Sequence, residues 1–224
     1  MKINNYTIFN STYTENWNKL RDSDNLSGFY VPFNKDEYIN NFNNYHVDRN
    51  SIEDLIKVVK KNKVKRVISF CSGTCYLEYF IKKNFKLNVI VSDYTSSIER
   101  ISNFKIFDDV IKLDINNKIK FDFKESDLIL LSRIDTEFTD SQLLSVFKKL
   151  MENNARRIYF IPAEILNLKT CFVKFKIIIK CFLNFRKPLK WGYIRSDNHF
   201  KRIFNTYFTT LKLRKGYLIY SNEN

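Results

Sequence analysis

From residue 51 onward, apolar runs alternate with segments whose apolar residues recur at helical spacing. The apolar runs are VKRVISF, LNVIVSD, DVIKLDI, SDLILLSR and RRIYFIPA, and the helical segments before and between them begin near residues 51, 75, 96 and 141. Strands with few polar interruptions that alternate with helices are typical of a parallel sheet covered on both faces. The pattern therefore predicts a doubly wound α/β fold.

The alternation ends near residue 196. Ser196 and Asp197 can cap a helix that runs through Tyr207. FTTLKLR, a turn at Lys215-Gly216, and YLIYS then have the pattern of an antiparallel hairpin. With the five earlier strands, the hairpin gives a mostly parallel sheet of seven strands.

The first 49 residues differ from the rest. They are rich in Asn, Tyr, Phe and Trp and have no clean period. We expect residues 1–49 to form a helical and irregular N-terminal appendage that packs its aromatic side chains on the main domain, with a lid as the functional alternative. Residues 50–224 are then the single α/β domain that a chain of 224 residues can hold.

The composition gives the chain a formal net charge of +14 at pH 7. Such a charge favours nucleic acid, anionic lipid or a phosphorylated substrate as partners. Lys, Asn and Ile are abundant throughout, however, as an AT-rich genome would also produce. Only four glycines occur in the chain, so each marks a place where the backbone has few alternatives, and Gly73 is one of them.

Targeting and metal signals are absent from the sequence. The first residues lack a charged leader with an apolar core, and no run reaches the roughly 18 apolar residues of a membrane span. We therefore expect a soluble, cytoplasmic protein. The cysteines Cys71, Cys75, Cys171 and Cys181 lack metal-ligand spacing, so we expect reduced thiols and no metal site.

The segment between the first main-domain strand and its helix reads Ser69-Phe70-Cys71-Ser72-Gly73-Thr74-Cys75. A loop at this place meets a helix N-terminus, which favours a polar or anionic ligand. A dinucleotide fingerprint would need a third glycine at position 76, where Tyr76 stands. The small residues fall instead at positions 71, 73 and 75.

This spacing resembles the first motif of class I S-adenosylmethionine-dependent methyltransferases, which runs roughly acid-x-Gly-x-Gly-x-Gly. In VIVSDYTSSIERI, Asp93 matches the acid that takes the ribose hydroxyls in that family, and it can accept from both. In IKLDI, Asp114 matches the acid near the adenine amine. The resemblance covers residues 50–221 and implies S-adenosylmethionine as cofactor. It implies these cofactor contacts: Ser69, Cys71, Gly73, Cys75, Asp93 and Asp114.

Two features depart from the family pattern. Ser69 stands where the family has an acid, which there helps hold the methionine portion or the loop itself, and cysteines replace two glycines. Because cysteine carries a Cβ, we expect negative φ at Cys71 and Cys75, with the demanding conformation on Gly73 alone.

The fourth strand ends in Ser132-Arg133-Ile134-Asp135 and lacks the Asn/Asp-Pro-Pro-aromatic signature of enzymes that methylate base amines. No Pro-Cys follows, as it does in cytosine carbon-5 enzymes. An oxygen acceptor is therefore favoured. Arg133 and Asp135 are candidate substrate-binding residues at the carboxyl edge of the sheet. Asp135 and His199 are the candidates for a general base, although a turn or cap for Asp135 and a packing role for His199 remain alternatives.

A second unusual segment spans residues 166–191. At 100° per residue Lys169, Lys176, Lys180 and Lys187 fall on one narrow stripe, and apolar residues surround most of the rest. We expect this helix to pack against the sheet and the appendage with its lysines outward. Contact with an anionic membrane is the alternative.

The favoured function is O-methylation of a sugar or small metabolite, with bacterial surface-polysaccharide synthesis as a setting. RNA methylation, suggested by the charge, and a non-catalytic methyltransferase-like binding or scaffold protein are the alternatives. The acceptor and the oligomeric state stay open.

Overall fold

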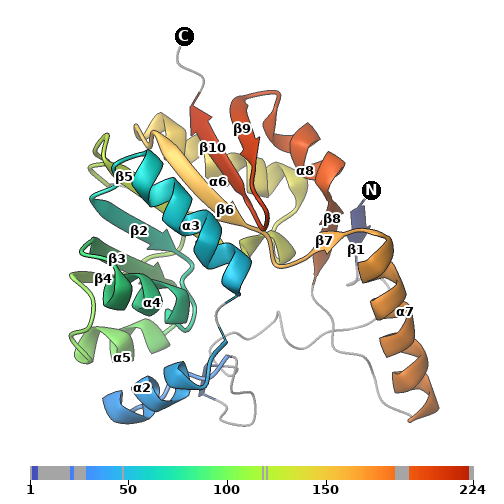
Figure 1. The fold of residues 1–224 in the computed structure, drawn as a ribbon, viewed down its shortest axis with the longest axis horizontal. Coiled ribbons are helices and arrows are strands. Elements are labelled where there is room, and N and C mark those ends of the chain that lie inside the picture. Colours follow the sequence, from blue (N-terminus) through green and yellow to red (C-terminus); the bar gives the residue numbers. More distant parts are fainter. Residues whose placement is uncertain are drawn as a thin grey trace.

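The computed structural model describes residues 2–4, 21–22, 29–46, 48–117, 119, 121–184 and 192–221. Its main sheet contains β2 (Arg66–Phe70), β3 (Asn88–Asp93), β4 (Asp109–Lys112), β5 (Asp127–Ser132), β6 (Arg157–Ile161), β9 (Phe208–Lys212) and β10 (Tyr217–Ser221). The spatial order is β4-β3-β2-β5-β6-β10-β9 (Figure 1). Strands β2 to β6 pair in parallel, and β10 is antiparallel to both neighbours. The expected doubly wound, mostly parallel seven-stranded sheet with a terminal hairpin is confirmed.

Helices cover both faces of this sheet, and one more helix, α7, lies away from it. The described helices are α2 (Lys35–Asn43), α3 (Arg49–Lys61), α4 (Tyr76–Asn84), α5 (Ser97–Asn103), α6 (Asp140–Glu152), α7 (Leu168–Leu183) and α8 (Asp197–Phe204). Buried residues of α2 to α5 pack together on one face, and those of α6 and α8 pack on the other. A short 3-10 helix, η2 (Ile134–Thr136), follows β5.

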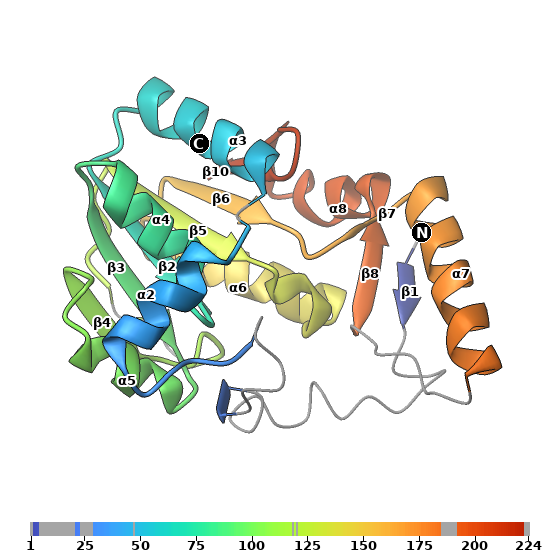
Figure 2. The same cartoon turned by 60° about the horizontal axis from the view of Figure 1, so that its bottom comes forward.

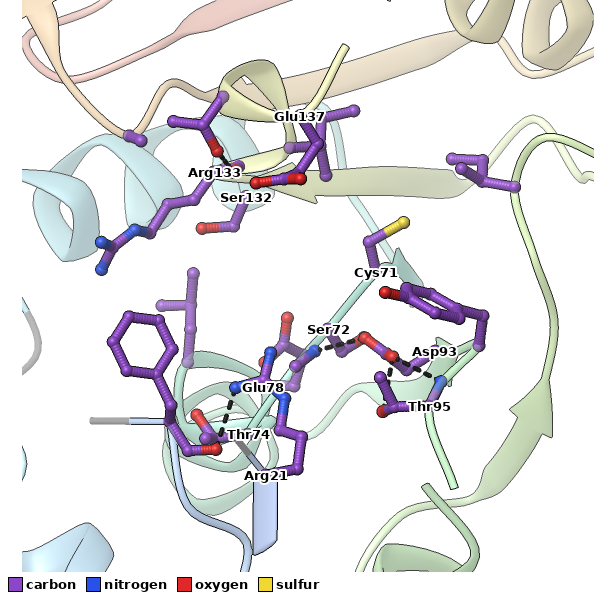
Figure 3. Close-up of a pocket in the computed structure, with 18 of the residues that line it drawn as sticks. Arg21, Cys71, Ser72, Thr74, Glu78, Asp93, Thr95, Ser132, Arg133 and Glu137 are labelled. Carbon is purple, nitrogen blue, oxygen red and sulfur yellow. Dashed lines mark hydrogen bonds between the residues drawn. The ribbon is translucent and has the colours of Figure 1, made fainter. Parts of the chain in front are cut away.

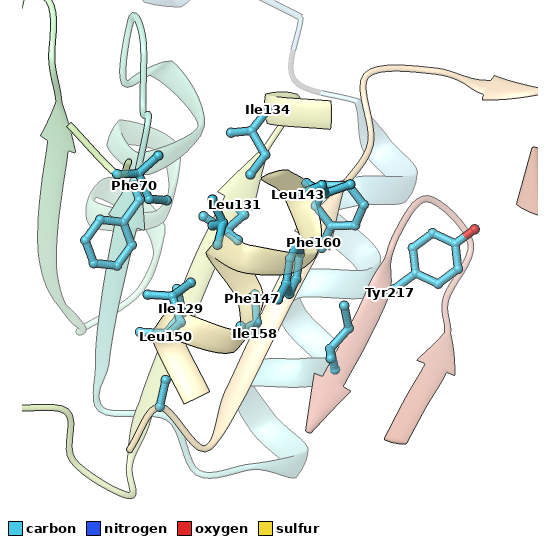
Figure 4. Packing of buried hydrophobic residues seen from close by; sticks show 14 of the residues in the cluster. Phe70, Ile129, Leu131, Ile134, Leu143, Phe147, Leu150, Ile158, Phe160 and Tyr217 are labelled. Atoms are coloured by element: carbon cyan, nitrogen blue, oxygen red, sulfur yellow. The ribbon is translucent and has the colours of Figure 1, made fainter. Parts of the chain in front are cut away.

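Strand β5 illustrates how the sequence pattern becomes a two-faced core. Its residues are almost completely buried, because alternate side chains point to opposite faces and both faces are covered. Ile129 and Leu131 pack with α6 residues such as Phe147, as Figure 4 shows. Burial of side chains of this size contributes about 1.5–3 kcal/mol each. The residues that follow the end of β5 are therefore attached to a tightly packed core.

A side-chain cap sets the beginning of α3. The side chain of Asp48 accepts hydrogen bonds from the amides of Asn50 (2.9 Å) and Ser51 (3.1 Å). These bonds satisfy amides that an uncapped helix would leave without partners, so α3 begins at Arg49. Of the appendage expected before this point, α2 is a helix, whereas residues 5–20 and 23–28 lie outside the described residues.

A second, small sheet was not predicted. It joins β1 (Lys2–Asn4), β8 (Tyr193–Ser196) and β7 (Ile165–Leu166), with β1 antiparallel and β7 parallel to β8. Strands of two to four residues are too short to produce a recognisable apolar period. Figure 2 shows this sheet between the main domain and α7.

Helix α7 differs from the expectation for residues 166–191. None of its residues is buried, so it does not pack an apolar face on the sheet. Residues 185–191 of that segment lie outside the described residues. Within the ranges given above, no helix has both the length and the apolar character to cross a membrane.

Candidate functional site

The loop between β2 and α4 has an unusual backbone. Cys71, Gly73 and Cys75 all have positive φ, at 55°, 60° and 57°. The expectation of negative φ at the two cysteines is therefore wrong, and all three small residues adopt the left-handed conformation. For a residue with a Cβ this conformation costs about 1–2 kcal/mol. The backbone follows a path suited to three glycines although only one is present.

Hydrogen bonds from neighbouring strand ends hold this path in place. The amide of Ser72 donates to the carbonyl of Ser92 (2.9 Å), and the amide of Gly73 donates to Oδ2 of Asp93 (2.8 Å). From α2, the hydroxyl of Tyr38 donates to the carbonyl of Thr74 (2.9 Å). The loop is thus fixed from both β3 and the N-terminal part of the chain.

Asp93 is more fully engaged than its sequence position suggested. Besides Gly73, it accepts from the amide (2.9 Å) and the hydroxyl (2.7 Å) of Thr95, both at Oδ1. Its side chain is only 4% exposed. A carboxylate has about four acceptor positions, so roughly one remains, at Oδ2. With these bonds intact Asp93 can accept from about one ligand hydroxyl, whereas the resemblance implied two, so its role toward a ligand stays a prediction.

Ser69 lies beneath the loop. It is fully buried and its hydroxyl donates to Oε1 of Glu78 in α4 at 2.6 Å. Burial raises the pKa of Glu78 to about 7, although the bond from Ser69 acts in the opposite direction. A carboxylate is therefore present beside the loop, but it comes from the helix instead of the strand.

Arg21 reaches the same place from the N-terminal segment. Its Nη2 lies 2.6 Å from the position that a Cβ on Gly73 would occupy. Its Nη1 donates to the carbonyl of Phe29 at 3.0 Å. Gly73 is thus required both for its positive φ and for the close approach of a guanidinium group.

A cavity of about 460 Å³ lies at the carboxyl edge of the sheet, and its lining includes Arg21, Gly73, Glu78 and Asp93. This volume falls within the range of about 300–1,000 Å³ that ligand sites occupy. Figure 3 shows Asp93 and Glu78 on one side and Arg133 and Glu137 across from them. The N-terminal segment adds Arg21, Phe29 and Tyr45 to the wall.

The same architecture occurs in solved methyltransferases. PigF with bound SAH is 13% identical, with a TM-score of 0.55, over 85% of this chain and 64% of that one. Magnesium protoporphyrin IX methyltransferase from Synechocystis PCC 6803, with bound SAH, is 12% identical, with a TM-score of 0.53, over 95% of each chain. The mitomycin 7-O-methyltransferase MmcR is 13% identical, with a TM-score of 0.50, over 70% of this chain and 48% of that one.

The fold is that of the S-adenosylmethionine-dependent methyltransferases. At this identity the likeness concerns the fold. The chain spans less than two thirds of the length of PigF and about half that of MmcR. No protein-family model matches the sequence, and no curated protein matches it.

Some of the residues singled out in the sequence line this cavity, and others do not. Those that line the cavity are Cys71, Gly73, Asp93, Asp114 and Arg133. Ser69 and Cys75 do not line it, because both side chains are fully buried behind the loop. They support the backbone path instead of facing a ligand.

The two candidate bases also lie outside the cavity wall. Asp135 is fully buried, accepts from the amide of Ala163 (2.8 Å) and has its pKa raised to about 7 by burial. His199, in α8, is hydrogen-bonded through Nε2 to Asp140 at 2.8 Å. Neither position suits a group that touches a ligand in this cavity.

Three charged residues of the cavity were missed: Arg21, Glu78 and Glu137. Glu78 is the third residue of α4, the helix that follows the loop. Its place in the first turn of that helix could have indicated from the sequence that it lies beside the loop. Arg21 comes from a region without a period, and nothing in the sequence places it beside Gly73. Among the residues that the structure describes, no cluster of three or more His, Cys, Asp or Glu could hold a metal ion.

Proposed function

We propose that this chain is an S-adenosylmethionine-dependent methyltransferase that methylates a hydroxyl oxygen of a sugar or another small metabolite. The observation that carries the proposal is the bond from the Gly73 amide to Asp93, at the mouth of a ligand-sized cavity. It holds a left-handed loop beside the end of β3, where doubly wound sheets bind nucleotides.

The charged groups in the cavity suit this cofactor. S-adenosylmethionine carries ribose hydroxyls, an ammonium group and a carboxylate. Asp93 retains about one acceptor position for a hydroxyl. Glu78 offers a buried carboxylate for the ammonium group, and Arg21 offers a guanidinium for the carboxylate. The amides at the start of α4, which has no side-chain cap, add the positive end of a helix dipole.

The cofactor supplies an activated methyl group, so the protein mainly has to orient the acceptor and exclude water. Aromatic side chains of Phe29, Tyr45 and Phe138 form part of the wall around the cavity. Arg133 and Glu137 lie on the side opposite Asp93 (Figure 3) and can hydrogen-bond a hydroxylated acceptor. We propose Glu137 as the group that takes the hydroxyl proton, because it faces the cavity and Asp135 does not.

The acceptor class rests on two further observations. MmcR is by name an O-methyltransferase, and the magnesium protoporphyrin IX enzyme is named for a small molecule. The sequence also lacks the base-amine signature after β5. We propose that this activity serves surface-polysaccharide synthesis in the cytoplasm of a bacterium.

Mass spectrometry of the purified protein tests the proposal. We expect co-purified S-adenosylhomocysteine or S-adenosylmethionine, and calorimetric binding of added S-adenosylhomocysteine. Absence of both would support a non-catalytic scaffold. Binding of RNA that falls steeply with salt, together with methylation of RNA but not of hydroxylated metabolites, would favour the nucleic-acid alternative.

A further inference from the structure

Helix α7 exposes an unusually large apolar surface. Its exposed apolar residues are Leu168, Phe172, Val173, Phe175, Ile177, Ile178, Ile179, Phe182 and Leu183. Leu168 is 90% exposed and Phe182 is 80% exposed. In Figures 1 and 2 the helix stands at the edge of the molecule, beside the small sheet and away from the main one. Surfaces of this kind mark interaction sites.

The apolar residues are arranged asymmetrically around α7. At about 100° per residue, one continuous arc of roughly 140° contains only apolar residues and Cys171. Its members are Ile178, Cys171, Phe182, Phe175, Leu168, Ile179, Phe172 and Leu183. The less exposed residues Thr170, Lys174 and Cys181 lie on the opposite side, toward the body. The apolar arc therefore faces away from the protein.

Basic residues border this arc. Lys169, Lys176 and Lys180 follow one another along its edge, and α7 has no acidic residue. The ion pair of Lys174 with Glu164 (2.8 Å) is on the body side. A second copy docked through this face would bring the same lysine row close to its partner, without a carboxylate on either helix. A lipid surface with anionic headgroups matches both the apolar arc and the lysines.

We propose that α7 docks this protein on an anionic membrane surface, with the arc inserted among the acyl chains and Lys169, Lys176 and Lys180 at the headgroups. The helix lies in the plane of the membrane, because its 16 residues span only about 24 Å and its lysines run along its whole length. This inference does not depend on methyl transfer. It places the protein where an acceptor attached to a lipid could be reached.

Vesicle flotation with the full chain tests the proposal. We expect binding to vesicles of phosphatidylcholine mixed with phosphatidylglycerol, weaker binding in high salt, and little binding to phosphatidylcholine alone. Reversal of the three lysines (Lys169→Glu, Lys176→Glu, Lys180→Glu) should reduce binding by at least about a hundredfold, the loss expected from their attraction alone. A control with the same charge change at the exposed Lys60, Lys86 and Lys124 should bind far better than this variant.

A second pair of variants tests the contribution of the apolar arc to vesicle binding. Phe172→Ser with Phe182→Ser should reduce vesicle binding more than tenfold, because each phenyl ring loses its burial. Leu211→Ser, at an exposed position of β9, should not. A fluorophore on Cys171, the exposed cysteine of α7, should move to an apolar environment when vesicles are added.

Two results would overturn the proposal. One is wild-type protein that does not float with anionic vesicles; a lower unfolding temperature of the phenylalanine variants would then mean that the chain itself covers α7. The other is a stable dimer that the phenylalanine variants dissociate, which would mean that a second copy covers the arc. Binding of S-adenosylhomocysteine should be unchanged in all α7 variants, so a failure here is separable from a failure of the proposed function.

Discussion

The amide of Gly73 donates a 2.8 Å hydrogen bond to Oδ2 of Asp93, and this bond joins the loop after β2 to the end of β3. Asp93 thereby has two tasks. It holds the loop in its left-handed path, and it presents one remaining acceptor position to the cavity. A substitution at Asp93 should consequently affect both the loop and the ligand.

The strain at the two cysteines can be measured by comparing glycine with alanine at each position. Both substitutions remove the sulfur, but only alanine keeps a Cβ at positive φ. We expect Cys71→Gly to be more stable than Cys71→Ala by about 1 kcal/mol, and the same order at Cys75. Chemical denaturation measures the difference.

Cys171, within α7, is the matched control. There the order should reverse, with alanine favoured by about 1 kcal/mol, because glycine is a poor helix former. If α7 unfolds before the rest of the protein, its helicity reports this difference. Alanine more stable than glycine at both Cys71 and Cys75 would contradict the left-handed loop.

The contact between Gly73 and Arg21 gives a second prediction. Gly73→Ala should destabilise the protein by about 1–3 kcal/mol and abolish binding of S-adenosylhomocysteine, since its Cβ meets the guanidinium of Arg21 at positive φ. Adding Arg21→Ala should recover part of the stability, because it removes the clash but not the backbone strain. A double-mutant cycle of unfolding free energies measures this coupling. Strictly additive effects would show that the two residues do not meet.

Glu78 predicts a pH dependence of ligand binding. Burial raises the pKa of Glu78 to about 7, so its carboxylate is largely protonated at pH 6 and ionised at pH 8. If this carboxylate holds the ligand ammonium group, affinity for S-adenosylhomocysteine should rise between these pH values. Glu78→Gln should bind more weakly at pH 8 and lose most of the dependence. The same rise in both proteins would exclude Glu78 as its source.

The contribution of Glu78 to folding stability depends on pH in the opposite direction to ligand binding. Because the pKa of Glu78 is higher in the folded protein than its ordinary value of 4.5, its contribution is fully present below pH 4.5 and is lost as the pH rises through about 7. The neighbours that also act on this group are Asp93, which raises its pKa, and the hydroxyl of Ser69, which lowers it. In Glu78→Gln this loss of stability with rising pH should be absent.

Asp135 should behave as a structural residue. Its Oδ2 has no hydrogen-bond partner, and burial raises its pKa to about 7. We expect Asp135→Asn to gain about 1–3 kcal/mol at pH 8, where the wild-type carboxyl must be charged in the interior, and to lose this advantage at pH 5. Its affinity for S-adenosylhomocysteine should match the wild type. A tenfold loss of affinity would instead place Asp135 in contact with the ligand.

The sheet and its helices could be predicted because each strand is buried on both faces and reads as an apolar run. VISF and LILL are short apolar runs between helical segments, which is the pattern of a covered parallel sheet. The position of Asp93 followed from strand length, since the carboxyl ends of parallel strands meet at one edge. Its bonds to Gly73 and Thr95 could not follow, because they depend on the path of the loop in space.

The remaining features depend on tertiary context. A cysteine normally avoids positive φ, and the tertiary surroundings of the loop, including its hydrogen bonds, hold Cys71 and Cys75 there. Arg21 is distant in sequence from Gly73, which it meets in the cavity. The exposure of α7 could not be inferred from its apolar composition either, because the same composition suits a helix packed in a core.

Titration calorimetry of S-adenosylhomocysteine with wild type, Asp93→Ala and Asp109→Ala tests the central claim most directly. Asp109 is the matched control, an exposed aspartate at the start of the neighbouring strand β4. A charge-assisted hydrogen bond contributes about 1.5–3 kcal/mol, so Asp93→Ala should bind at least about tenfold more weakly. Asp109→Ala should bind as the wild type does. Equal affinity of the wild type and Asp93→Ala, or no binding by the wild type, would contradict a methyltransferase cofactor site at the end of β3.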